Sequence, residues 1–270
     1  MNPIEDERPL PENAGSPDSF IDKWLARWPE WAVVQVFVPA SQRQTWLAWA
    51  ALQQELGDAA WGGADARPGE AKLGWWQEEL QGWSRGLRRH PLGALLQAQP
   101  ADWRGLADVL PALRDSRGRP ADAADAQRQV ETIARAFARI DAALDGAGHA
   151  SPFVSPAPDG VALATQQLLH ARLQLAGEMA VPLQELARAG HGDPVAPWAT
   201  RVPTLTGDPT HSGRSGRTAD RGGGSSGRTA VPHFRRITAT LAQGRLARGD
   251  AARPLPAWRA LWAAWQAARN

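Results

Sequence analysis

The chain has 270 residues with a formal net charge of +2, and it contains 14 Trp but neither Cys nor Tyr. This length suffices for one large domain or two small ones. The missing Cys excludes a disulfide framework, a thiolate metal site and a cysteine nucleophile. The nearly balanced charge indicates no nucleic acid as a partner. No secretory signal pattern and no apolar run of about 20 residues is present, so we expect a cytoplasmic protein with at most peripheral membrane contact.

The first part of the chain predicts helices separated by short breaks. Residues 1–17 are polar and rich in Pro, which is typical of a disordered lead-in. A helix should follow from residue 18 or 19 to Trp28. The β-branched run 31–38 would suit a strand, but no partner strands are expected elsewhere, so a buried helical turn or an extended link is the better interpretation. A long helix is predicted over 42–61.

The stretch 70–92 has a strong helical pattern with a defined end. Its apolar residues recur at i, i+3, i+7 and i+10, which places them on one stripe: Leu73, Trp76, Leu80 and Trp83. The charged residues, including Glu78 and Glu79, are expected mostly on the other faces. Gly86 should end this helix, and Pro91 should open the next one after His90.

The remaining helices follow at intervals set by Pro and Gly. We expect Pro100 and Pro111 to act as breakers, and Pro182 to interrupt a long helical stretch. The predicted helices are 90–97, 102–115, 122–145, 161–189, 233–248 and 256–268.

Residues 199–230 differ from the rest of the chain. They are rich in Gly, Ser, Thr and Arg and nearly lack large apolar side chains. Such a segment cannot bury enough surface to offset its ordering entropy, so we predict a disordered insertion. The abrupt change is also what a local reading-frame error would produce.

The predicted fold is all-α, because Ala, Leu and Arg are abundant good helix formers. The expected organisation is a lead-in (1–17), a helical domain (18–198), the insertion (199–230) and C-terminal helices that complete the domain (231–270).

The order of residues in 71–92 carries a family resemblance. The run A-K-L-G-W-W-Q-E-E-L (71–80), followed by G-L-R-R-H-P-L (86–92), resembles the squalene/phytoene synthase family of head-to-head prenyl synthases. It is most similar to the divergent branch of phytoene-synthase-like proteins and respiratory complex I assembly factors. The resemblance is good over 42–95, weaker over 125–190 and absent over 199–230. It implies a single helical bundle of the isoprenoid-synthase type.

Active members of this family use two aspartate-rich motifs on facing helices. Carboxylates three or four residues apart share one helix face and can hold Mg²⁺ against a substrate diphosphate. The metal then neutralises the leaving group, while the apolar bundle interior shelters a carbocation.

Both motifs are degraded in this chain. The first retains Asp58, with Glu55 three residues before it, and the second has Gln174 and Glu178 at its two acidic positions. Gln carries no charge and is a poor Mg²⁺ ligand. Arg43 is a further candidate for contact with a diphosphate.

Two functions from different classes remain open. One is a non-catalytic prenyl-lipid-binding or assembly protein, with a lipid or a protein as partner and possible contact with the periphery of the inner membrane. The other is an active Mg²⁺-dependent prenyltransferase that condenses prenyl diphosphates and uses Glu55, Asp58 and Glu178. Mg²⁺ is an expected cofactor only for the second, and the sequence alone does not decide whether the chain is an enzyme.

Other patterns have simpler interpretations. The pairs Asp18/Asp22 and Asp141/Asp145 are expected to be helix caps or solvated helix ends. His90 is expected to cap a helix boundary. No two His have the i, i+4 spacing of a zinc pair.

The tryptophans bear on whether the interior is a pocket. They would either line a cavity wide enough for a prenyl chain or fill it and make a packed bundle: Trp46, Trp49, Trp75, Trp76 and Trp83. A second group lies on one side of the terminal helix with Arg259 and Arg269 nearby: Trp258, Trp262 and Trp265. This helix should dock on the bundle, or alternatively lie on a membrane.

Overall fold

The computed structural model describes residues 15–146, 156–205 and 231–269, and every regular element in these ranges is helical. The all-α prediction is therefore confirmed. The elements of the first half are α1 (Pro17–Arg27), α2 (Trp31–Val34), η1 (Gln35–Phe37), α3 (Ala40–Trp61), α4 (Arg67–Trp83), α5 (Gly93–Leu96), α6 (Trp103–Asp115) and α7 (Ala123–Asp145). Those of the second half are α8 (Pro158–Ala176), η2 (Gly177–Ala180), α9 (Leu183–Ala189), α10 (Val195–Leu205), α11 (His233–Leu246) and α12 (Ala257–Arg269).

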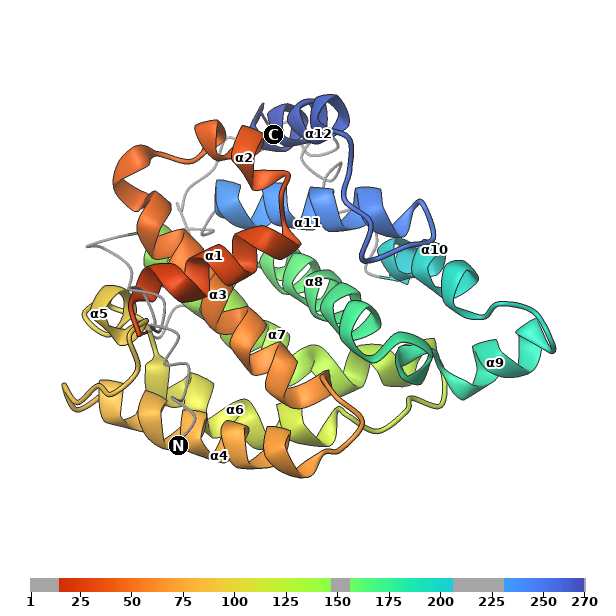
Figure 1. The fold of residues 1–270 in the computed structure, drawn as a ribbon, viewed down its shortest axis with the longest axis horizontal. Coiled ribbons are helices and arrows are strands. Elements are labelled where there is room, and N and C mark those ends of the chain that lie inside the picture. The colour runs from red at the N-terminus through yellow and green to blue at the C-terminus, as the bar shows by residue number, and fades with distance from the viewer. Residues whose placement is uncertain (1–14, 147–155, 206–230, 270) are drawn as a thin grey trace, which may run out of the picture.

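The long helices α3, α7 and α8 form the centre of the bundle (Figure 1). On one side α4 packs against both α3 and α6, and α6 in turn packs against α7. On the other side α11 packs against α8 and carries α12 on its outer surface. Helix α1 lies across α3, which brings the N-terminal side chains over the helix that carries the first predicted motif.

Tryptophans fill the interior instead of lining a wide pocket. The rings of Trp46, Trp49, Trp76 and Trp83 are each at most 2% exposed. Several meet edge to face, as Trp83 does with Trp103 at 5.2 Å between ring centroids and 83° between planes. This geometry is favourable for aromatic pairs and leaves little space between the rings. Of the two interpretations of these residues, the structure shows the packed bundle.

Several local predictions hold and others need correction. Residues 31–37 of the run 31–38 are helical and Val38 is extended, and Gly86 follows α4 with a φ of +81°. Pro111 lies inside α6 and does not break it. The break in the 161–189 stretch begins before Pro182, at Gly177, where φ is +54° and a glycine is favoured.

The predicted insertion 199–230 also needs correction at its start. Residues 199–205 belong to α10, because Trp198, Ala199 and Val202 form a buried apolar stripe. The rest of the insertion, 206–230, and most of the lead-in, 1–14, lie outside the described residues.

No helix within the three described ranges is both long enough and apolar enough to cross a bilayer. The terminal helix α12 does dock on the bundle, but it does so with alanines. Ala260, Ala264 and Ala267 are its buried residues, whereas its three tryptophans face outward.

Candidate functional site

The site predicted from the sequence lies where α1, α3 and the start of α4 meet. Glu55 and Asp58 share one face of α3 and point toward α1. Glu55 is 4% exposed, so its carboxylate needs partners to offset the cost of burial. Those partners are cationic side chains from other helices and not a cluster of further acids.

Both lysines of the chain converge on Glu55. The Nζ atom of Lys23 lies 2.6 Å from Oε1, and that of Lys72 lies 2.5 Å from Oε2. These two lysines are the only ones in the sequence, against 28 arginines among 30 basic residues. They come from α1 and α4, so the pairing links three helices through one carboxylate.

Asp58 is held in the same way. Arg27 of α1 donates to both carboxylate oxygens, from Nη1 to Oδ1 at 2.6 Å and from Nη2 to Oδ2 at 3.2 Å. Lys23 also approaches Oδ2 at 3.1 Å, so it bridges Asp58 and Glu55. The cluster of Lys23, Arg27, Glu55, Asp58 and Lys72, called here the α1–α3 charge cluster, has three positive and two negative charges.

The cluster keeps Glu55 ionised. Burial by itself raises the pKa of Glu55, but hydrogen bonds from Lys23 and Lys72 outweigh it, and the pKa lies below its ordinary value. Burial likewise lowers the pKa of Lys23, yet its bonds to Glu55 and Asp58 more than compensate and raise the pKa overall. Glu55 and Lys23 thus stay charged across the neutral range.

The second motif is divided between two environments. Gln174 of α8 lines a cavity that Arg27 also lines, so it faces α1 and α3. Glu178 lies in η2, where its side chain is 62% exposed and 3.5 Å from Nη2 of Arg119, and it does not line the cavity. Arg43 donates to the carbonyl of Val38 at the start of α3 and is also not part of the cavity wall. Gln174 thus shares the cavity with Arg27, the partner of Asp58, but neither Glu55 nor Asp58 lines that cavity.

The cavity lies between α1, α3 and α8 and has a volume of about 50 Å³. Glutamine side chains are its main polar lining: Gln53, Gln54, Gln167 and Gln174. The buried side-chain amide of Gln54 has no hydrogen-bond partner in the protein at either its nitrogen or its oxygen. A cavity of this size has room for a few water molecules, which would satisfy the polar groups in its wall.

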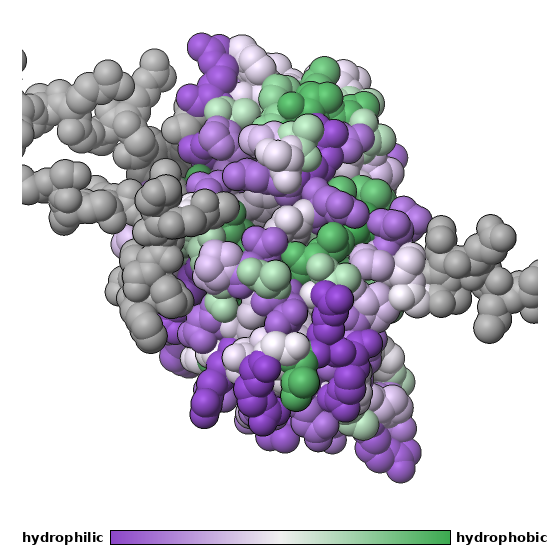
Figure 2. All heavy atoms as spheres, turned by 90° about the vertical axis from the view of Figure 1, so that its left-hand side faces the viewer, coloured by the Kyte–Doolittle hydropathy of each residue, from purple (hydrophilic) through white to green (hydrophobic). Residues whose placement is uncertain are grey.

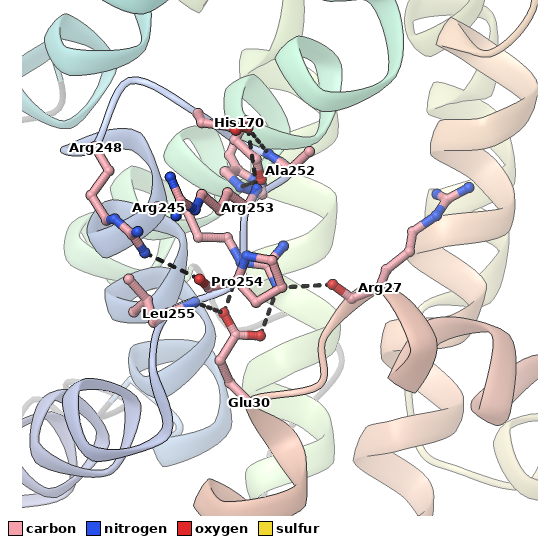
Figure 3. Close-up of polar contacts among 11 residues, drawn as sticks. Arg27, Glu30, His170, Arg245, Arg248, Ala252, Arg253, Pro254 and Leu255 are labelled. Carbon is pink, nitrogen blue, oxygen red and sulfur yellow. Dashed lines mark hydrogen bonds and ion pairs between the residues drawn. The ribbon is translucent and has the colours of Figure 1, made fainter.

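A buried ion pair lies next to Trp28, one of the residues that line the cavity, and Figure 3 shows the pair. Arg245 of α11 binds Glu30 through Nε at 2.9 Å and Nη2 at 2.6 Å, and neither side chain is exposed. The guanidinium lies 4.1 Å from the ring centroid of Trp28, a residue that lines the cavity. This pair therefore fixes the junction of α1 and α2 against α11.

His170 lies beside this pair and also lines the cavity. Its Nε2 is 3.0 Å from the carbonyl oxygen of Ala251. Burial lowers the pKa of His170 to about 3, and the charge of Arg245 acts in the same direction. The neutral imidazole therefore donates from Nε2 to the carbonyl oxygen of Ala251.

Sequence reasoning missed a second buried ion pair next to α3. Asp141 was expected at a solvated helix end, but it is 2% exposed and pairs with Arg235 of α11 at 2.6 Å. The indole Nε1 of Trp49 also donates to it at 2.8 Å. The prediction for Asp141 was wrong because α11, which is 94 residues away in sequence, covers the end of α7. His90 does cap its turn, since its Nδ1 accepts from the backbone of Leu92 at 3.2 Å.

The side chains at this site do not fit Mg²⁺ as they are arranged. Both oxygens of Glu55 and of Asp58 are already paired with lysine or arginine nitrogens, and Gln174 is uncharged. Within the described residues, no group of three or more His, Cys, Asp or Glu is placed to hold a metal ion. The arrangement is suited to joining helices α1, α3 and α4 through charge.

No family model, no curated protein and no solved structure matches this chain. The resemblance to squalene and phytoene synthases therefore depends on the residues quoted above.

Proposed function

We propose that the chain is a divergent squalene/phytoene synthase family protein, with a bundle of the isoprenoid-synthase type, that acts without catalysis as a binding or assembly protein. The observation that carries the proposal is the α1–α3 charge cluster. The carboxylates of Glu55 and Asp58, which an active member would present to metal ions, are instead paired with Lys23, Lys72 and Arg27. A diphosphate bridged by Mg²⁺ would have to displace these internal ion pairs.

The interior supports the same conclusion. A pocket for a small ligand usually has a volume of roughly 300 Å³ or more. The cavity here has about 50 Å³, and buried tryptophans occupy the neighbouring space. Because this cavity is much smaller than a ligand pocket, the assembly role is better supported than storage of a lipid in the core.

Calorimetric titration with farnesyl diphosphate tests the proposal. The full chain, with and without Mg²⁺, is compared with Asp58→Asn, which keeps the size of the side chain but removes its charge. We expect no Mg²⁺-dependent binding in either protein. Tight binding that requires both Mg²⁺ and Asp58 would refute the proposal and support the prenyltransferase alternative, which product analysis would then examine.

A variant of the cluster sharpens the test. In Lys23→Gln/Lys72→Gln the carboxylate of Glu55 loses both its ionic partners, which lie at 2.6 and 2.5 Å in the native chain. If the lysines stand in place of a metal ion, Mg²⁺ should raise the midpoint of thermal unfolding of this variant and leave that of the native chain unchanged. Arg135→Gln, which opens an exposed pair with Glu131, is the control and should not respond.

A further inference from the structure

Large apolar side chains gather on the outer surface at one end of the molecule. Eight such side chains are exposed in the described part of the chain, and five of them belong to η1 or α12: Val36, Trp258, Leu261, Trp262 and Trp265. Helix α12 contacts both α2 and η1, so the five lie in one region. Figure 2 shows apolar surface at the end of the molecule where α2 and α12 lie in Figure 1.

Helix α12 presents its large residues outward, the reverse of an ordinary surface helix. Its exposed residues recur at i, i+3, i+4 and i+7, which is one helical face, with Trp258 68%, Leu261 44%, Trp262 61% and Trp265 42% exposed. The opposite face consists of small buried residues, Ala260, Ala264 and Ala267. Packing against the bundle thus uses the alanines and leaves the tryptophans available.

The helix is held firmly in this orientation. The backbone N–H of Leu255, two residues before α12, donates to Oε1 of Glu30 at 2.8 Å. Glu30 is in turn bound by Arg245 inside the protein. Since the segment that leads into α12 is fixed by a buried ion pair, a rigid scaffold presents the outward face.

The charged residues of α12 and of the segment before it, from residue 251 on, are all arginines. The stretch 251–269 contains Arg253, Arg259 and Arg269 and no acidic residue. The guanidinium of Arg259 lies 5.0 Å from the ring centroid of Trp258, and that of Arg269 lies 4.4 Å from the ring centroid of Trp265. Arginines beside exposed indoles suit a boundary between an apolar layer and negatively charged groups.

The area and charge argue against a second copy of the chain as the occupant. If a free Trp side chain presents about 250 Å², the three exposed rings offer on the order of 400 Å². A standard interface buries roughly 800 Å² on each partner. Two copies of this face would also bring arginines together without acidic partners. A lipid bilayer, in contrast, does not need a surface that is complementary in shape to bind the face. Trp side chains also favour the interfacial region of a bilayer.

We propose that the outward face of α12 binds the surface of an anionic membrane, with its tryptophans in the interfacial layer and its arginines at the headgroups. Membrane binding does not depend on the proposed lack of catalysis, because it uses neither the α1–α3 charge cluster nor the cavity. The chain would lie on the membrane with α12 parallel to its plane.

Sedimentation with lipid vesicles tests the proposal. The full chain is mixed with vesicles of phosphatidylcholine alone or of phosphatidylcholine with phosphatidylglycerol. We expect binding to the anionic vesicles, which Trp258→Ala/Trp262→Ala/Trp265→Ala weakens about tenfold or more. Changing Arg253, Arg259 and Arg269 together to Gln should remove the preference for anionic lipid, again by about tenfold.

A control variant has the same number of exposed apolar side chains replaced elsewhere. Leu87→Ala/Met179→Ala/Leu183→Ala removes residues that are 63, 52 and 55% exposed, and its vesicle binding should equal that of the native chain. Because all these positions are exposed, unfolding midpoints should stay unchanged, which separates lost binding from lost folding.

Three results would overturn the proposal. In the first, the native chain stays in the supernatant with both vesicle types. In the second, the tryptophan variant binds as well as the native chain. In the third, light scattering shows a dimer that only the tryptophan variant loses, without vesicle binding by either protein. The last result would assign the face to a second copy of the chain. None of these measurements involves Mg²⁺ or a diphosphate, so the outcome does not depend on whether the protein is an enzyme.

Discussion

Removing the charge of Glu30 should be among the most destabilising single changes in this protein. Glu30→Gln leaves the guanidinium of Arg245 buried without a counter-ion, in a place where both native side chains are 0% exposed. It also weakens the hydrogen bond that the backbone N–H of Leu255 donates to Oε1 of Glu30. Breaking one side of a buried pair costs about 3–5 kcal/mol, a large part of the roughly 5–15 kcal/mol that stabilises a typical domain.

Urea unfolding followed by far-UV circular dichroism measures this loss as a change in the free energy of unfolding. The matched control is Glu131→Gln, which removes the same charge from a pair with Arg135 whose side chains are 50 and 56% exposed. An exposed pair of this kind contributes about 0–1 kcal/mol. The double change Glu30→Gln/Arg245→Met should regain part of the loss, because it removes the uncompensated buried charge. A cost below about 1 kcal/mol for Glu30→Gln would refute the role given to this pair.

Two further predictions concern buried polar residues. The pKa of His170 is lowered to about 3 in the folded chain, from the ordinary value of 6.5 that applies in the unfolded chain. At a pH between these two values the unfolded chain therefore binds more protons than the folded chain. The stability contributed by neutral His170 should be lost as pH falls from 6.5, by about 2 kcal/mol at pH 5. Urea titrations at several pH values should show that the unfolding free energy of His170→Gln depends less steeply on pH than that of the native chain. Equal slopes of unfolding free energy against pH would contradict the assignment. The carboxylate of Glu79 accepts from the backbone N–H of Arg89 and of His90, each at 2.7 Å, and from Trp83 Nε1 at 2.8 Å. Glu79→Ala should therefore cost about 2–4 kcal/mol in the same assay, whereas the neighbouring exposed Glu78→Ala should cost little, and equal effects would contradict the role of Glu79 as a buried cap.

The helices of this chain could be predicted because their information is local. The stripe of Leu73, Trp76, Leu80 and Trp83 lies on the buried side of α4, as its spacing indicates. Asp102 and Asp122 accept from backbone N–H groups three residues on and begin α6 and α7 close to the predicted positions. Caps and apolar periodicity act within one or two turns, so a single sequence contains them.

The buried polar residues could not be predicted because their partners are distant in sequence. Glu79 was expected on an outer face of α4, and it is 2% exposed because the chain reverses after Gly86 and lays residues 89 and 90 over it. Asp141 depends in the same way on α11. In both cases the residue type suggested solvent, and tertiary contacts determined otherwise.

The terminal helix docks on the bundle as predicted, but the sequence did not indicate which of its faces would be covered. Its sequence contains a strong apolar face, and such a face ordinarily packs inward. The structure uses the opposite, alanine-rich face because small side chains let α12 approach α11 closely. Periodicity identifies the two faces of a helix but does not determine which of them the rest of the fold covers.

Lysine and arginine form ion pairs of different geometry in this protein, and the difference bears on the proposed loss of metal binding. Each arginine in a buried pair donates to one carboxylate from two of its nitrogens, as Arg235 does to Asp141 and Arg245 does to Glu30. A planar guanidinium suits that geometry, whereas an ammonium is a compact point charge that can lie between two carboxylates. Lys23 does this between Glu55 and Asp58. Under the proposed function, Lys23 takes the place between these two carboxylates that a divalent cation would have in an active member of the resembled family.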